Sequence, residues 1–138
     1  MARQELEIFL ESVESAFRAG DVDLLLRYFQ LPLVIYTAAG IATLNTEEEF
    51  AAMTQNYLAA LTAMAVASGH QSILSFDPPV NNRLRVKVRT IDKDVDGNPI
   101  TSSTIRYFLL QTDTGLVIEM MEYLEAPLSI SDIEKIVH

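Results

Sequence analysis

The sequence predicts an α+β domain in which helices cover a mostly antiparallel sheet. Three observations support this prediction. Apolar residues recur at helical spacing in the first half of the chain, and they alternate at strand spacing in the second half. The predicted strands are joined by short links, which favour antiparallel neighbours. Helices followed by a run of strands are typical of α+β proteins and not of parallel βαβ sheets.

Composition limits the classes of protein that the chain can belong to. Its 138 residues, 49% of them hydrophobic, suit a single domain over residues 1–138. A net charge of −9 disfavours nucleic acid as a partner, and the lack of cysteine excludes disulfides and thiolate metal sites. The start does not resemble a signal peptide, and the small-apolar stretch from Leu58 to Ala67 is too short to span a bilayer. We therefore expect a soluble cytoplasmic protein without a membrane partner.

Two helices are predicted before the first strand. The first has one apolar stripe, with charged residues on most of its remaining surface. It ends at Ala19-Gly20, and Asp21 is a good N-cap for a shorter second helix that runs through Phe29 and stops at Leu31-Pro32. The apolar stripe of the first helix consists of Leu6, Phe9, Leu10, Val13 and Phe17.

A hairpin and a third helix follow. Residues 33–37 are β-branched and aromatic, and Ala39-Gly40 offers a turn into a short partner strand over residues 41–44. Thr46 and Glu49 have the spacing of a capping box, which predicts a long helix that closes near Gly69.

The rest of the chain predicts four strands. They cover residues 70–77, 83–93, 101–112 and 116–124, with turn sequences between them. In the last strand Ile118 and Met120 fall on one face and Met121 on the other, so both faces of the sheet are expected to be covered. Three helices can cover only one face, and this predicts a homodimer through the outer sheet face. After Pro127, Ser131 is expected to cap a last helical turn.

This order of elements resembles the NTF2-like superfamily, in particular its SnoaL-like branch. The Ala19-Gly20-Asp21 junction, Tyr28-Phe29 and the Thr114-Gly115 turn carry the resemblance, which covers roughly residues 5 to 125. It implies an NTF2-like cone, in which a strongly curved sheet wraps around three N-terminal helices and encloses an apolar pocket. Members include isomerases, dehydratases, polyketide cyclases and non-catalytic binding or assembly domains, so the fold alone does not decide the function.

The branches of the superfamily place their reactive groups differently. A ketosteroid-isomerase-like site would fall on Val13 and Thr37, which cannot perform that chemistry. A scytalone-dehydratase-like site would use His70, but its second histidine could only be His138. The cyclase-like branch relies on an acid near the end of the last strands, where this chain has glutamates such as Glu122 and no aspartate.

Three residues are candidates for catalysis. His70 could act as an acid or base near neutral pH, although a single such group without a partner favours a solvated residue where a strand begins. Arg106 and Glu122 each interrupt an apolar run. Facing each other in the pocket, they would anchor a substrate carboxylate or carbonyl; otherwise they would form a structural ion pair at the sheet rim or dimer face.

We expect the pocket to take a small, largely apolar molecule. Any reaction would be a proton transfer without a cofactor, as in an isomerase, dehydratase or cyclase. The alternative is a non-catalytic dimeric domain whose pocket is vestigial or filled by its own side chains. The predicted lining residues are Val13, Phe17, Phe29, Tyr36, Met53 and Tyr57, with polar points at Tyr36, His70 and Arg106.

Two further patterns have a plain structural interpretation. Residues 92–98 imitate the opening of an EF-hand calcium loop, but Ser103 stands where the bidentate glutamate is needed, so a hairpin turn without a metal is expected. Arg83, Arg85, Lys87 and Arg89 alternate along one strand. They could form an anion track, but nearby acidic residues favour a solvated or salt-bridged face.

Overall fold

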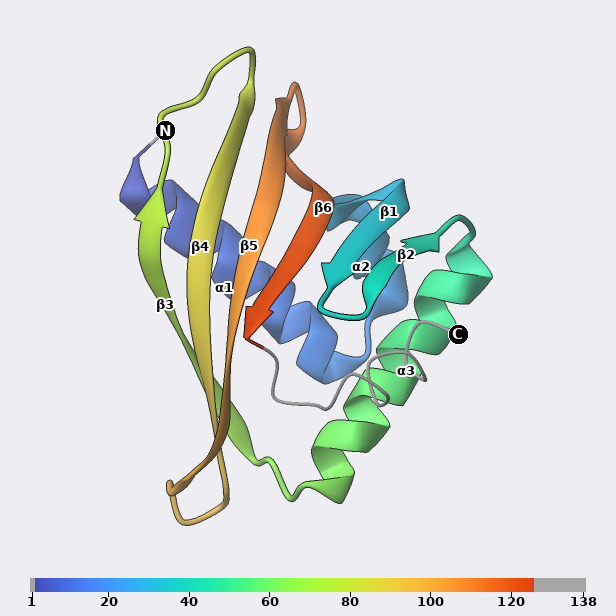
Figure 1. Cartoon of the computed structure of the whole chain (residues 1–138), viewed down its shortest axis with the longest axis vertical. Coiled ribbons are helices and arrows are strands. Elements are labelled where there is room, and N and C mark those ends of the chain that lie inside the picture. Colours follow the sequence, from blue (N-terminus) through green and yellow to red (C-terminus); the bar gives the residue numbers. More distant parts are fainter. Residues whose placement is uncertain (1, 126–138) are drawn as a thin grey trace.

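The computed structural model describes residues 2–125, which form three helices and a six-stranded sheet (Figure 1). The predicted α+β class is confirmed. The turn expected after Pro127 lies outside the described residues. In chain order the elements are α1 (Arg3–Ala19), α2 (Val22–Tyr28), β1 (Phe29–Thr37), β2 (Gly40–Leu44), α3 (Glu47–Ala63), β3 (Ser68–Phe76), β4 (Arg83–Lys93), β5 (Pro99–Thr112) and β6 (Gly115–Glu125).

The sheet has the strand order β2-β1-β6-β5-β4-β3. Its neighbouring strands are antiparallel except for β1 and β6, which are parallel. Figure 1 shows the long strands bending around α1, which runs diagonally across one face of the sheet, while α3 lies beside the end formed by β1 and β2. This inner face and the helices enclose the core. Within residues 2–125, no helix is long and apolar enough to cross a membrane.

The helix ends follow the local signals in the sequence. Gly20 adopts the left-handed conformation, with φ of 66°, and its N–H donates to carbonyls at the end of α1. Asp21 then caps α2 by accepting a hydrogen bond from the N–H of Leu24 at 3.1 Å. Thr46 caps α3 in the same way by accepting from the N–H of Glu49 at 3.1 Å.

Two predicted boundaries are wrong. Phe29 begins β1 instead of ending the second helix, and Pro32 lies inside this strand. The pairing between β1 and β6 shifts register between Phe29 and Val34, so Pro32 falls in an interrupted part of the ladder, where a missing N–H is tolerated. The third helix ends at Ala63, well before Gly69, because Ala65 has a positive φ and turns the chain toward β3.

The core lies between the helices and the inner face of the sheet. β4 shows the principle, because its inward residues are buried while the residues between them are at least partly exposed. α1 and α3 place their apolar faces against these strands. The largest fully buried apolar side chains are Phe50, Leu6, Leu25, Leu33, Leu44, Leu109, Ile118, Val86 and Val88.

A bulge in β6 corrects the predicted face assignment of its residues. Leu109 pairs with Ile118 and Phe108 with Met120, so Glu119 is the extra residue. Ile118 and Met121 consequently both face inward. Met120, predicted to share a face with Ile118, lies on the outer face.

The outer face is partly apolar around β1, β5 and β6. Tyr36, Ile41 and Leu124 are exposed there, next to the partly buried Phe108 and Met120. A second copy of the chain would cover these side chains, but the homodimer stays a prediction.

Candidate functional site

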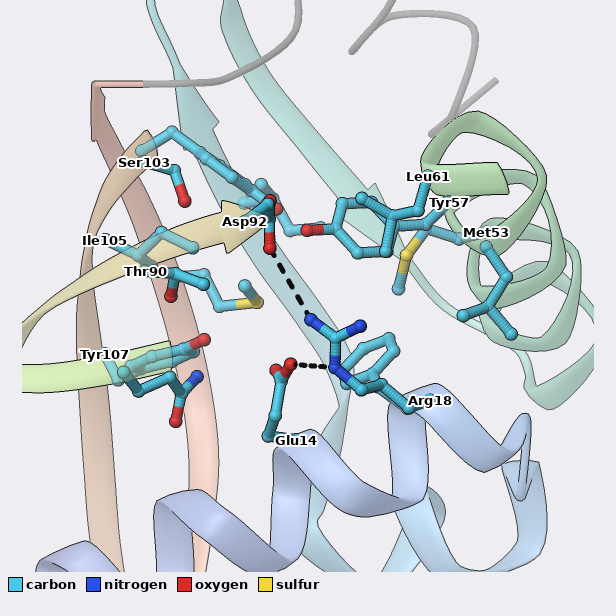
Figure 2. Close-up of a pocket in the computed structure, with 16 residues that line it drawn as sticks. Glu14, Arg18, Met53, Tyr57, Leu61, Thr90, Asp92, Ser103, Ile105 and Tyr107 are labelled. Atoms are coloured by element: carbon cyan, nitrogen blue, oxygen red, sulfur yellow. Dashed lines mark hydrogen bonds and ion pairs between the residues drawn. The ribbon is translucent and has the colours of Figure 1, made fainter. Parts of the chain in front are cut away.

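A small cavity lies between α1, α3 and the inner face of the sheet (Figure 2). Its volume is about 50 Å³. One water molecule needs about 10–15 Å³ by this measure, so the cavity holds a few waters or a compact ligand. The lining residues are Glu14, Phe17, Arg18, Ile35, Met53, Tyr57, Leu58, Leu61, Gln71, Thr90, Asp92, Ser103, Ile105, Tyr107, Met121 and Tyr123.

Asp92 is the buried acid of this cavity. On β4 it lies in phase with the inward residues Val86, Val88 and Thr90, and its side chain is only 3% exposed. Its carboxylate oxygen Oδ1 lies 3.5 Å from Nη2 of Arg18. The other oxygen, Oδ2, is buried and has no hydrogen-bond partner within the described part of the chain.

Arg18 lies between two carboxylates. Its Nε donates to Oε1 of Glu14, one helical turn earlier on α1, at 2.6 Å, and its Nη2 reaches Asp92 (Figure 2). Gly69, which pairs with Asp92 across β3 and β4, makes room for this guanidinium. A Cβ on Gly69 would overlap with Nη2 of Arg18 and would lie 3.0 Å from Oδ1 of Asp92.

Burial raises the pKa of Asp92 above its ordinary value. The Arg18 guanidinium lowers this pKa in opposition, and the Glu14 carboxylate raises it further. The net direction is upward, so desolvation outweighs the ion pair. A second polar atom without a partner, Oε1 of Gln71, is buried in the cavity wall. The cavity therefore contains hydrogen-bonding capacity that residues 2–125 do not use.

Three tyrosines complete the polar lining. Burial raises the pKa of Tyr57 and Tyr107, and it raises the pKa of Tyr123 to about 12. All three phenols are therefore neutral near neutral pH, where they can both donate and accept hydrogen bonds. Figure 2 shows Tyr57 reaching in from α3 with its hydroxyl toward Asp92.

Only some of the residues predicted to line the pocket lie at this cavity. Phe17, Met53 and Tyr57 line this cavity. Val13 and Phe29 belong to the core beside it, and the ring of Phe29 meets the ring of Phe17 edge-on at a centroid distance of 5.9 Å. Tyr36 lies on the outer face of the sheet, where it pairs with Glu122 and is 37% exposed.

None of the three candidate catalytic residues lines the cavity. His70 is exposed on the edge strand β3, opposite Ile91. Arg106 and Glu122 face each other across β5 and β6, with Arg106 Nη1 2.7 Å from Glu122 Oε1, but they do so on the outer face. Strand alternation explains this correction, because Ile105 and Tyr107, the neighbours of Arg106, point inward. The pair is a cross-strand ion pair and not a pocket anchor.

Glu14, Arg18 and Asp92 were not singled out from the sequence, although two signals could have indicated them. Glu14 and Arg18 are four residues apart on a predicted helix, the spacing of an ion pair. Asp92 continues the inward phase of an otherwise apolar strand face. A carboxylate in that phase is unusual, because buried charges need a partner.

The loop between β4 and β5 is a hairpin turn, as predicted. Asp94 Oδ1 accepts hydrogen bonds from the N–H groups of Asp96 and Asn98, at 3.0 and 2.9 Å. Across residues 2–125, no group of three or more histidine or acidic side chains is arranged to hold a metal ion. The basic row on β4 is partly paired, because Arg83 contacts Glu119 and Arg85 contacts Asp77.

Solved structures share this fold at low sequence identity. An NTF-2 like protein of unknown function from Shewanella oneidensis is 17% identical, with a TM-score of 0.65 over 89% of this chain and 98% of that one. A second such protein, from Silicibacter pomeroyi, is 18% identical, with a TM-score of 0.59 over 89% and 94%. The protein Aln2 from a Streptomyces species is 12% identical, with a TM-score of 0.65 over 91% and 93%. At these identities the likeness shows the fold alone.

The family assignment rests on the sequence. No curated protein matches the chain. The family described as NTF2-like protein (DUF6841) matches residues 4–124, which is most of the chain and includes every lining residue of the cavity. The predicted NTF2-like fold is confirmed, and the chain belongs to this NTF2-like family, DUF6841.

Proposed function

We propose that the chain is a SnoaL-like pocket protein that binds a compact, largely apolar molecule with one polar end, and that Asp92 exchanges a proton with this molecule. One observation carries the proposal. Asp92 is buried in the cavity wall, its pKa is raised, and its Oδ2 has no hydrogen-bond partner in the described chain. A buried polar oxygen without a partner costs about 1–3 kcal/mol, which a bound donor or a proton relieves.

The two halves of the cavity suit the two ends of such a molecule. Met53, Leu61, Ile105 and Met121 provide apolar walls for its body. The polar end would meet Asp92, whose raised pKa brings the carboxyl closer to neutral pH, where a general base takes up and returns a proton most effectively. Arg18 would stabilise the ionised carboxylate between transfers. This chemistry needs no cofactor, and it is that of an isomerase, dehydratase or cyclase acting next to a carbonyl.

The cavity volume limits the choice of probe. About 50 Å³ favours a small ring or a short chain, and a larger substrate would have to displace the flexible side chain of Met53. Cyclopentanone is a suitable probe, because it is compact and apolar, carries one carbonyl and has acidic α-hydrogens that a general base can exchange.

Deuterium exchange tests both halves of the proposal. In heavy water, cyclopentanone binding should shift the methyl resonances of Met53 and Met121 in the wild-type protein. The protein should also catalyse deuterium incorporation at the α-carbons of the ketone. The Asp92→Asn variant should still bind the ketone, but its exchange rate should be at least about tenfold lower than that of wild type, because an amide cannot accept the proton. Asp113→Asn, the same change in the exposed β5–β6 turn, is the control. Equal exchange rates in both variants would refute the role of Asp92.

A second candidate is a non-catalytic dimeric binding or assembly domain. The exposed Tyr36, Ile41 and Leu124 on the outer face favour it, as does the small size of the cavity. Analytical ultracentrifugation at micromolar concentration should then give a dimer mass, and Phe108→Asp on the same face should give a monomer. A wild-type monomer would argue against this candidate.

A further inference from the structure

Three charged side chains meet at the cavity, and the arginine lies between the two carboxylates. Glu14 contacts Arg18 through Nε at 2.6 Å, and Arg18 contacts Asp92 through Nη2 at 3.5 Å. With Asp92 ionised, this group has one net negative charge; with Asp92 protonated, its net charge is zero. In neither state does the cavity have a net positive charge to offer.

We propose that Glu14 determines the charge class of the ligand: by neutralising Arg18, it makes the cavity accept uncharged molecules and reject anions. This inference rests on the proposed function, because it requires a ligand in the cavity. It also differs from the sequence-based expectation, in which Arg106 and Glu122 would together anchor a substrate carboxylate or carbonyl.

An arginine at a pocket wall is normally an anion site. Its guanidinium presents donors in a planar fork that fits a carboxylate, and an unpaired arginine would hold such a ligand strongly. Here Arg18 directs Nε to Glu14 and Nη2 to Asp92 (Figure 2). A carboxylate ligand that reached the remaining donors of this guanidinium would lose its hydration, while the positive charge it met would already be balanced by two carboxylates.

The remaining polar groups do not change this balance. Among the described lining residues Arg18 is the one cation. Tyr57, Tyr107 and Tyr123 face the cavity as neutral phenols, and Gln71, Thr90 and Ser103 are uncharged. A carbonyl, amide or hydroxyl can exchange hydrogen bonds with these groups and with Asp92, so a neutral polar end is the class that fits.

Glu14 can be changed without disturbing the core. Its side chain is 26% exposed, and it lies at the edge of the cavity and is not one of the buried residues of α1. Glu14→Gln keeps the size of the side chain and an oxygen that can accept from Arg18 Nε, so it removes the charge and little else. Glu11→Gln, an exposed position one turn earlier on the same helix, makes the same change in net charge away from the cavity.

A matched pair of probes tests the inference. Butyramide and butyrate have nearly the same shape but differ in charge, and their binding can be followed at neutral pH through the methyl resonances of Met53 and Met121. The wild-type protein should bind butyramide at least about tenfold more tightly than butyrate. Glu14→Gln should strengthen butyrate binding about tenfold relative to butyramide binding, and Glu11→Gln should leave both affinities as in wild type.

The outcomes separate this inference from the function on which it rests. Equal wild-type affinities for butyrate and butyramide would overturn the inference and leave the proposed function standing. The same would follow if Glu11→Gln strengthened butyrate binding as much as Glu14→Gln. If neither probe bound to any of the three proteins, the cavity would not be a ligand site for such molecules, and both proposals would fall.

Discussion

The two faces of the sheet each hold an arginine–carboxylate pair, and the two pairs differ in a way that distance alone does not show. On the outer face Arg106 and Glu122 are 2.7 Å apart, with side chains 31% and 35% exposed. On the inner face Arg18 and Asp92 are 3.5 Å apart, but the side chain of Asp92 is 3% exposed. Pairs that keep contact with water on both sides, as Arg106 and Glu122 do, contribute about 0–1 kcal/mol, whereas a buried charge that loses its partner is costly. The longer contact is therefore the more consequential one.

The faces also differ in how completely their charges are satisfied. On the outer side the Arg83 side chain makes two hydrogen bonds to the Glu119 carboxylate, and Arg85 donates to Asp77. On the inner side a carboxylate oxygen, Asp92 Oδ2, is buried without a partner in residues 2–125, as is Gln71 Oε1, whereas the one such atom on the outer side is the neutral hydroxyl of Thr104. Unsatisfied groups of this kind lower stability, and they are found where a protein binds or reacts. This contrast supports the proposal that any ligand binds at the inner face.

The largest expected effect comes from removing the arginine of each pair. Arg18→Met leaves Asp92 buried without its cation, and we expect it to lower the free energy of unfolding by about 2 kcal/mol at neutral pH. Arg106→Met, on the outer face, should cost less than about 0.5 kcal/mol. Urea unfolding of both variants measures the difference. Similar losses of stability in the two variants would show that burial does not make the inner pair more important than the outer pair.

A smaller effect, of opposite sign, is expected for Asp92→Asn. The pKa of Asp92 is raised in the folded state, so the native protein holds this proton more tightly than the unfolded chain. Its contribution to stability is therefore present at low pH and is lost as the pH rises from about 4, the ordinary carboxyl pKa, through the raised pKa of the folded state. Asp92→Asn removes this loss and should be about 1 kcal/mol more stable than wild type at neutral pH.

The pH dependence of the difference is the diagnostic measurement for this variant. Urea unfolding between pH 4 and pH 8 should show the advantage of Asp92→Asn growing with pH and then levelling off. Ser72→Ala, an exposed change that removes no ionisable group, should show no such growth. A constant difference between Asp92→Asn and wild type across this range would mean that Asp92 does not titrate with a raised pKa.

Local signals explain how much of the fold the sequence could predict. The apolar stripe of α1, the caps Asp21 and Thr46, and the short turns between strands act over a few neighbouring residues, and the structure follows them. The bulge at Glu119 is different, because it depends on how β6 pairs with β5. Nothing in the local pattern of β6 marks the extra residue. Simple alternation therefore assigns the residues after Ile118 to the wrong faces of the sheet.

The candidate site was less accessible to the same reasoning. Arg106 attracted attention as a charge in an apolar run, yet simple alternation already places it opposite Ile105 and Tyr107. The same rule places Asp92, near the end of the predicted strand over residues 83–93, on the inward face. The meeting of Arg18 with Asp92 joins α1 to β4 and depends on how the helix crosses the sheet. The periodicity of a strand or a helix does not predict such contacts between elements that are far apart in the sequence.

The smallest expected effect on stability, and the sharpest test of this packing, is Gly69→Ala. The new methyl group would collide with Nη2 of Arg18, the flexible end of a long side chain, so the guanidinium can move away from Asp92 while the strand keeps its place. Alanine is at least as favourable as glycine within a strand, and we expect unfolding to change by less than about 0.5 kcal/mol. The pKa of Asp92, however, should rise further, because the opposing effect of Arg18 is weakened.

Carbon NMR titration of the Asp92 carboxyl measures this shift directly. Ser72→Ala, an exposed change on the same strand, should leave the titration where it is in wild type. An unchanged Asp92 titration in Gly69→Ala would show that the arginine does not depend on the space above the glycine. Because Gly69→Ala removes no charge and no hydrogen-bonding group, a shift would have to arise from the space that the methyl group takes beside Arg18 and Asp92. Such a shift would show the effect of the space around Arg18 and Asp92 while both residues are still present. Substitutions of Arg18 or Asp92 cannot show this, because they remove one of the two charges.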